Sequence, residues 1–172
     1  MRTALFFLIS MLTCLPALAA SGDRAESPPC PQPLSGLIAA ALAHTLVDAQ
    51  DLPDFELVGR SSPVLIDASV DAPDCRITQA DAPQALGMRY SVVNEGALQQ
   101  YANQRGKVAF VGVNGAEIRD GGTRGTVHLG VAIKVAEKSN AALICCCGGE
   151  ALFRKNAAGR WVFKAWGPVV CG

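Results

Sequence analysis

Cysteine is the residue type in this chain whose number and spacing could do the most specific chemistry. The 172 residues include seven cysteines, and three of these are consecutive, at residues 145–147. Their thiolates could hold a soft metal ion such as Cu(I) or zinc. The two-residue spacing that is usual between zinc thiolates is absent, however, and no His or Met adjoins the triplet. The alternatives are structural disulfides and a labile, redox-active disulfide, and the compartment of the protein decides between metal binding and disulfide formation.

The first 20 residues predict that the protein is exported. Arg2 gives a basic start, residues 4–12 are mostly apolar, and small residues at Ala17 and Ala19 stand where a signal peptidase cuts. The apolar run is too short to cross a hydrocarbon core of roughly 30 Å. We therefore expect cleavage after Ala19 or Ala20, followed by residence in the periplasm or outside the cell, where disulfides persist.

Disulfides are the preferred interpretation of the cysteines in such a compartment. Cys14 is removed with the signal, so that six of the seven cysteines remain, an even number that fits three bridges. The turn at residues 156–159 sets the register of the last two strands and places Cys145 opposite Cys171. A bulge at the glycines after the triplet would place Cys146 there instead. The candidates for the other bridges are Cys30, Cys75 and the remaining triplet residues, Cys146 and Cys147.

Four other side chains are weak candidates for a binding site. His128 could act as a general base near neutral pH, together with Tyr90 or Tyr101 in an apolar pocket. Trp166 could stack on a ligand, although a place in the core or at its rim is the simpler explanation. None of these residues forms a known catalytic motif, and we assign no catalytic residue.

The remaining titratable residues predict neither a metal site nor a cofactor. Asp67, Asp71 and Asp74 offer the carboxylate oxygens that calcium prefers, but their spacing does not follow the ligand pattern of an EF-hand loop. We expect them in turns. His44 lies between apolar positions of a predicted helix and is expected to be partly exposed.

Charge and composition indicate a compact domain without a charged macromolecular partner. Basic and acidic residues number 15 each, and removing Arg2 with the signal leaves 14 against 15. This balance implies neither nucleic acid nor, once the signal is removed, a membrane. Half of the chain is hydrophobic and 17% is charged, which is typical of a globular protein. We expect a signal peptide at 1–20, a proline-rich linker at 21–33 and one domain at 34–172.

Hydrophobic periodicity predicts two helices followed by a run of strands. Apolar residues recur at helical spacing over 34–49, and Asn94 and Gly106 suit the start and the stop of a second helix. The clearest strand is 126–135, whose odd-numbered residues are aliphatic. The expected strands, in chain order, are 64–66, 107–113 with continuation to 118 as the alternative, 126–135, 142–155 and 160–170.

This element order predicts an α+β fold, in which a curved antiparallel meander packs around the helices as a roll. The order resembles those of the NTF2-like and cystatin-like folds from about residue 34 to the C-terminus. The resemblance rests on no sequence motif and implies no functional residues. A β-sandwich for the C-terminal half is the alternative.

Two classes of function fit this inventory, and binding is preferred to catalysis. The first is an exported, disulfide-stabilised domain that binds a small apolar molecule or a protein partner. The second is a cavity enzyme of acid–base type, such as an isomerase or lyase. A thiolate metal-binding protein is a further alternative. An ionisable side chain with a hydrogen-bonding partner inside a closed apolar pocket would favour the enzyme.

Overall fold

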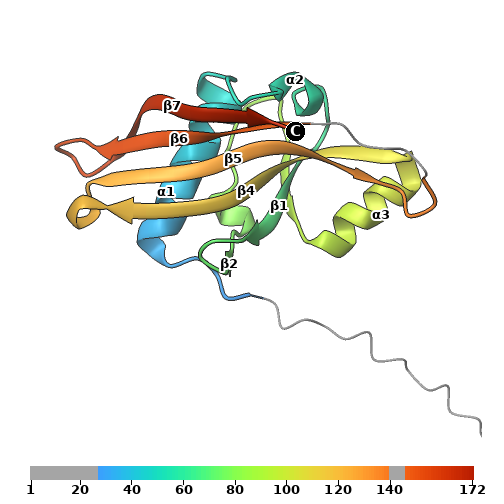
Figure 1. Ribbon diagram of the computed structural model, residues 1–172, viewed down its shortest axis with the longest axis horizontal. Coiled ribbons are helices and arrows are strands. Elements are labelled where there is room, and N and C mark those ends of the chain that lie inside the picture. The colour runs from blue at the N-terminus through green and yellow to red at the C-terminus, as the bar shows by residue number, and fades with distance from the viewer. Residues whose placement is uncertain (1–26, 140–145) are drawn as a thin grey trace, which may run out of the picture.

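The computed structural model describes residues 27–139 and 146–172, and these form an α+β fold (Figure 1). A mixed sheet of seven strands runs through the molecule in the order β2-β1-β4-β5-β6-β7, with β3 also paired to β1. The α+β class predicted from the sequence is confirmed. The predicted signal peptide and Cys145 lie outside the described residues.

Helix α1, Gln32–Ala43, carries the first predicted apolar stripe and continues as a π-helical turn at His44–Asp48. Leu37, Ile38 and Leu42 on this stripe are completely buried. In Figure 1 the helix crosses behind the strands. Burial of one continuous face against the sheet therefore explains why the sequence forms a helix here.

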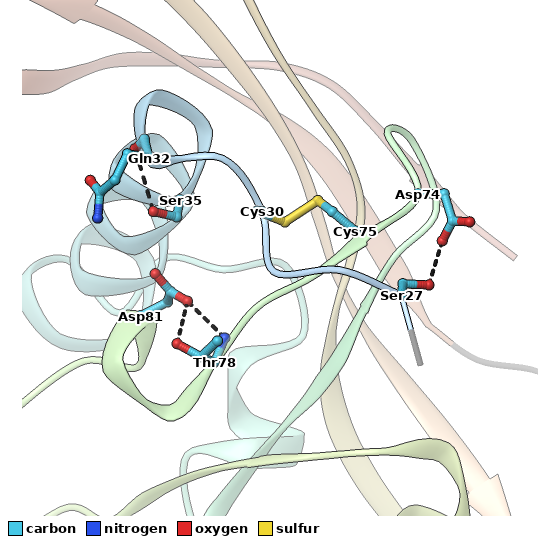
Figure 2. The surroundings of a disulfide bond; sticks show 8 residues. All are labelled: Ser27, Cys30, Gln32, Ser35, Asp74, Cys75, Thr78 and Asp81. Atoms are coloured by element: carbon cyan, nitrogen blue, oxygen red, sulfur yellow. Dashed lines mark hydrogen bonds between the residues drawn. A yellow bond between two sulfur atoms is a disulfide. The ribbon is translucent and has the colours of Figure 1, made fainter. Parts of the chain in front are cut away.

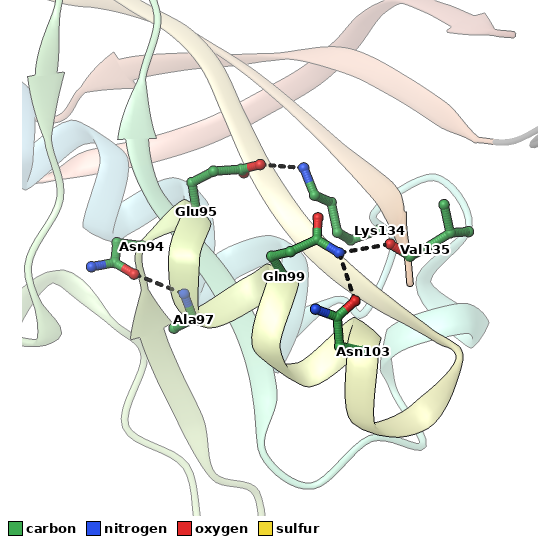
Figure 3. A network of polar contacts seen from close by, with 7 residues as sticks. All are labelled: Asn94, Glu95, Ala97, Gln99, Asn103, Lys134 and Val135. Atoms are coloured by element: carbon green, nitrogen blue, oxygen red, sulfur yellow. Dashed lines mark hydrogen bonds and ion pairs between the residues drawn. The ribbon is translucent and has the colours of Figure 1, made fainter. Parts of the chain in front are cut away.

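Helix α3, Glu95–Arg105, connects two parallel strands, β3 at Tyr90–Val93 and β4 at Lys107–Arg119. Both strands pair with β1, Val64–Val70, which lies between them. The predicted cap is confirmed, because Asn94 Oδ1 accepts a hydrogen bond from the Ala97 N–H at 2.9 Å (Figure 3). The predicted stop is confirmed as well, since Gly106 has a φ of 82°.

The last four strands form the predicted antiparallel meander. Strand β4 pairs with β5, β5 with β6, and β6 with β7, in chain order. On β5, Val127, Leu129 and Val131 are buried as the alternation predicts, while Ile133 is half-buried. The bounds of these later strands are Arg124–Val135 for β5, Cys147–Lys155 for β6 and Trp161–Cys171 for β7. The shorter elements are α2 at Phe55–Val58, β2 at Cys75–Arg76 and 3-10 turns at Gln79–Asp81 and Asp120–Gly122.

The two helices cover opposite faces of the sheet. Alternate residues of β1 belong to different cores: Ile66 packs in the α1 core and Leu65 in a smaller core with Leu98 of α3. The cause is topological, because a crossover from β3 to the parallel β4 must carry its helix across one face of the sheet. The described C-terminal half thus contributes strands to one sheet, and the β-sandwich alternative is not formed.

A disulfide between Cys30 and Cys75 ties the segment before α1 to β2 (Figure 2). The Cys30 N–H also donates to the Arg76 carbonyl at 2.9 Å. Nearby, the Ser27 hydroxyl donates to Asp74 Oδ1 at 2.6 Å (Figure 2). The described residues of the predicted linker are therefore fixed against the sheet by covalent and polar contacts.

A second disulfide joins Cys147 to Cys171, so the prediction of Cys145 as the partner of Cys171 is wrong. The turn does set the register as expected, because Phe153 lies opposite Phe163. Farther from the turn, two irregularities each shift the β6–β7 pairing by one residue. A total shift of two residues keeps the same face of β6 toward Cys171 but replaces Cys145 by Cys147. Cys146 is disulfide-bonded as well.

Candidate functional site: a groove with a glycine floor

An open groove of about 870 Å³ lies on the face of the sheet opposite α1. Helix α3 covers one end of this face, and the groove occupies the part beside it. Its lining comes from strands β1, β4, β5 and β6, from the turn that follows β1 and from the end of β7. The volume falls within the range of roughly 300–1,000 Å³ that is usual for sites that bind small molecules.

The floor of the groove is a row of three glycines on adjacent strands. Gly112 of β4 pairs with Gly130 of β5, which pairs in turn with Gly148 of β6. Because glycine has no side chain, the row leaves a channel that runs across the strands. A Cβ on Gly130 would lie 3.0 Å from the Gly148 Cα and 3.1 Å from the Cys147 carbonyl oxygen. The close approach of β5 and β6 therefore requires glycine at position 130.

Paired residues on neighbouring strands form the two walls of the channel. On the side toward α3 the wall residues are Phe110 and Ala132, which lie opposite each other on β4 and β5. On the far side, His128 of β5 pairs with Glu150 of β6. His128 Nδ1 lies 3.8 Å from Glu150 Oε1, and their side chains are 42% and 38% exposed. This distance is too long for a direct hydrogen bond, and water screens the pair.

Asp67 stands at the β1 end of the groove. Its Oδ1 accepts a hydrogen bond from the Ser69 N–H at 3.0 Å. Burial raises the pKa of the Asp67 carboxyl above its ordinary value, and the negative charges of Glu95 and Asp71 act in the same direction. Asp67 is thus a half-buried carboxyl group with two acidic neighbours, Glu95 and Asp71.

Acidic side chains dominate the charge of the lining. They are Asp67, Asp71, Glu117 and Glu150. In the described part of the chain, no lysine or arginine lines the groove. Arg119 pairs with Glu117 at 2.7 Å and offsets that one charge at the rim. The other carboxylates give the groove a negative potential at neutral pH.

Of the four residues predicted for a binding site, the structure places only His128 in the groove. Tyr90 is buried in the α1 core, where its hydroxyl donates to the Leu46 carbonyl at 3.2 Å and burial raises its pKa. Tyr101 lies on α3 against the smaller core, with the Arg105 guanidinium 5.3 Å from its ring centre. The predicted grouping of His128 with a tyrosine is therefore not assembled.

Trp166 and His44 belong to an aromatic cluster in the α1 core. Trp166 Nε1 donates to Asp51 Oδ2 at 3.0 Å, and the Trp166 ring packs edge-on to Phe163. His44 stacks on Phe163 with the ring centres 4.1 Å apart. Both are half-buried, so that His44 is partly exposed as expected. The cluster explains these side chains by packing and places them away from the groove.

The residues considered as metal ligands do not converge. Among residues 27–139 and 146–172, no group of three or more His, Cys, Asp or Glu side chains is placed to hold a metal ion. Cys147 and Cys171 are bonded to each other, so neither offers a thiolate. Asp74 contacts Ser27, whereas Asp67 and Asp71 line the groove.

Sequence reasoning missed the glycine floor because each glycine alone resembles a bulge marker. The available signal was Gly130, which interrupts the outward face of the clearest strand between His128 and Ala132. Whether Gly130 forms part of a groove floor depends on which residues of β4 and β6 lie opposite it, and only the register of the strands shows that these are glycines.

No protein-family model matches the chain, and no curated protein or solved structure matches it. Within the described residues no helix has the length and hydropathy needed to cross a membrane.

Proposed function

We propose that this protein is an exported binding domain that takes a small molecule with an apolar body into its groove without catalysing a reaction. The observation that carries the proposal is the aligned row of Gly112, Gly130 and Gly148, which leaves backbone as the floor. A flat apolar body can contact this floor over its whole width. Phe110 and Ala132 add an apolar wall beside it.

Export is supported by the predicted signal peptide together with the disulfides. The bonds Cys30–Cys75 and Cys147–Cys171 each join segments distant in sequence. Such bonds are maintained in oxidising compartments and are rare where glutathione keeps thiols reduced.

The polar residues of the groove support binding more than acid–base catalysis. A general base needs a position that is oriented by a partner and sheltered from water. The imidazole of His128 forms no hydrogen bond within the described part of the chain, and its nearest acid, Glu150, lies 3.8 Å away and is also exposed. Neither predicted tyrosine is near enough to line the groove.

The variant Gly112→Val tests the proposal directly. A Cβ at this position would meet only Asn114 Oδ1, at an ordinary 3.5 Å, so valine fits the strand while its methyl groups fill the channel. The measurement is the fluorescence of the neutral dye N-phenyl-1-naphthylamine, which brightens in apolar sites. We expect the wild type to bind the dye and Gly112→Val to bind it at least about tenfold more weakly.

Thr126→Val is the matched control. Thr126 lies on the same face of β5 as Gly130, the pairing partner of Gly112, but it does not line the groove. This variant should leave the dye affinity unchanged. Unfolding curves of both variants check that the fold is intact. The proposal fails if the folded wild type does not bind the dye, or if Gly112→Val and Thr126→Val bind it equally well.

A further inference from the structure

The charges around the groove select the kind of molecule it can take. Asp67 and Asp71 lie at one end of the channel and Glu150 borders it on β6. The nearby cation Lys134 is bound to Glu95 of α3 (Figure 3). An anion entering the groove would therefore meet uncompensated negative charge, whereas a cation would be attracted.

Asp67 is the carboxylate best placed to hold a cation. It is half-buried on β1, where the preceding residue Ile66 pairs with Val111 of β4, so that Asp67 lies at the β4 end of the glycine row. Among its described neighbours, Glu95 and Asp71 are acidic and raise the pKa of Asp67, in addition to the effect of burial. A positive charge next to Asp67 would relieve both effects by favouring the ionised carboxylate.

The floor favours a small organic molecule over a peptide. Gly112, Gly130 and Gly148 belong to paired strands, in which backbone N–H and C=O groups bond to the neighbouring strands. A peptide laid across this floor would lose water from its own amides and gain few hydrogen bonds. A flat aromatic body carries no such groups. The three glycines span about 10 Å from β4 to β6, which matches a body of two fused rings.

We infer that the ligand of the groove is a small organic cation, whose flat aromatic body lies on the glycine floor and whose protonated amine pairs with Asp67. The inference rests on the proposed function, since it specifies the ligand of the same groove. Phe110 and Ala132 contact one side of the aromatic body, and His128 and Glu150 border the other.

The test compares three probes that share one ring system. They are 2-naphthylmethylamine, which is protonated at neutral pH, the neutral 2-naphthalenemethanol, and the anionic 2-naphthoate. Titration calorimetry at low salt gives their affinities for the disulfide-bonded wild type. We expect the amine to bind at least about tenfold more tightly than the alcohol, and the naphthoate to bind most weakly.

Two charge-neutralising variants then locate the cation. Asp67→Asn should reduce the affinity for the amine to that for the alcohol, and should leave the affinity for the alcohol unchanged. Glu56→Gln is the control, because it removes the same charge from an exposed position on α2 outside the groove. It should leave both affinities unchanged. Thermal unfolding of each variant confirms that the fold persists.

The outcomes separate this inference from the proposed function. If alcohol and naphthoate bind as tightly as the amine, the groove binds apolar molecules but is not selective for cations, and only the inference fails. If a blocked tetrapeptide of two lysines and two alanines binds more tightly than the amine, the occupant is a basic peptide. If none of the three probes binds, the proposed function fails together with the inference. Equal effects of Asp67→Asn and Glu56→Gln would remove Asp67 as the partner.

Discussion

Gly130 and Gly148 approach so closely that a Cβ on Gly130 would lie 3.0 Å from the Gly148 Cα. The nearest atoms are backbone, which cannot move aside as a flexible side chain can. Strands β5 and β6 can therefore approach this closely at the centre of the groove only because Gly130 and Gly148 have no side chains.

The first prediction is that Gly130→Ala destabilises the fold. The added methyl group has to push β6 away, and overpacking of this kind costs on the order of 1–3 kcal/mol. Gly112→Ala on the neighbouring strand has room and should be neutral or slightly stabilising. Urea unfolding of both variants measures the difference. Equal stability of the two would show that β5 and β6 are not in close contact.

Leu129 on the opposite face of β5 should be essential to the α1 core. The side chain is 1% exposed, so Leu129→Ala is expected to lower the free energy of unfolding by about 2–5 kcal/mol. Ile133 on the same face is half-buried, and Ile133→Ala should cost less. Denaturant midpoints of the two variants test this order. A larger loss at Ile133 would contradict it.

Removal of each disulfide should destabilise the protein to a different extent. The bonds Cys30–Cys75 and Cys147–Cys171 join residues separated by 45 and 24 positions. Loop-closure entropy then predicts losses of roughly 4 kcal/mol for the Cys30–Cys75 bond and roughly 3.5 kcal/mol for the Cys147–Cys171 bond in the double Cys→Ser variants. Thermal unfolding of each double variant provides the comparison. The prediction is contradicted if either one unfolds at the wild-type temperature.

The carboxyl of Asp67 should make the protein less stable as the pH rises. Burial raises the pKa of Asp67 in the folded state above the ordinary value of 3.8, so the folded state binds this proton more tightly than the unfolded state does. Its stabilising contribution is complete below pH 3.8 and is lost as the pH rises through the raised pKa. Asp67→Asn removes this loss and retains an acceptor for the Ser69 N–H.

Urea unfolding at pH 3 and pH 7 provides the test. The stability of Asp67→Asn relative to the wild type should be higher at pH 7 than at pH 3. Glu56→Gln, at an exposed position, serves as the control for the change in net charge. A variant that loses stability relative to the wild type as the pH rises would have the opposite sign and would refute the argument.

The predicted signal peptide gives a further testable outcome. Small residues at Ala17 and Ala19 suit a signal peptidase, so the mature protein should begin at Ala20 or Ser21. N-terminal sequencing of protein recovered from the exported fraction measures this. Protein that keeps Met1 and stays in the membrane fraction would argue against export.

The sequence by itself determined the elements whose signals are local. The stripe on α1 repeats every three or four residues, the cap at Asn94 acts within α3, and the alternation on β5 lies within one strand. The turn before β7 likewise determined the nearest pairing, Phe153 with Phe163. Each of these depends on residues a few positions apart, and periodicity and capping report such short-range interactions directly.

Only the tertiary structure decided the features that depend on pairing between distant segments. Irregularities beyond the Phe153–Phe163 pair moved the partner of Cys171 from Cys145 to Cys147, and the turn residues carry no information about them. The parallel pairing of β1 with β3 and β4 separated the helices onto two faces. The alignment of Gly112, Gly130 and Gly148 required three strands in one register. Strand register is a collective property of packing across the whole sheet, so the groove could not be found from any one segment.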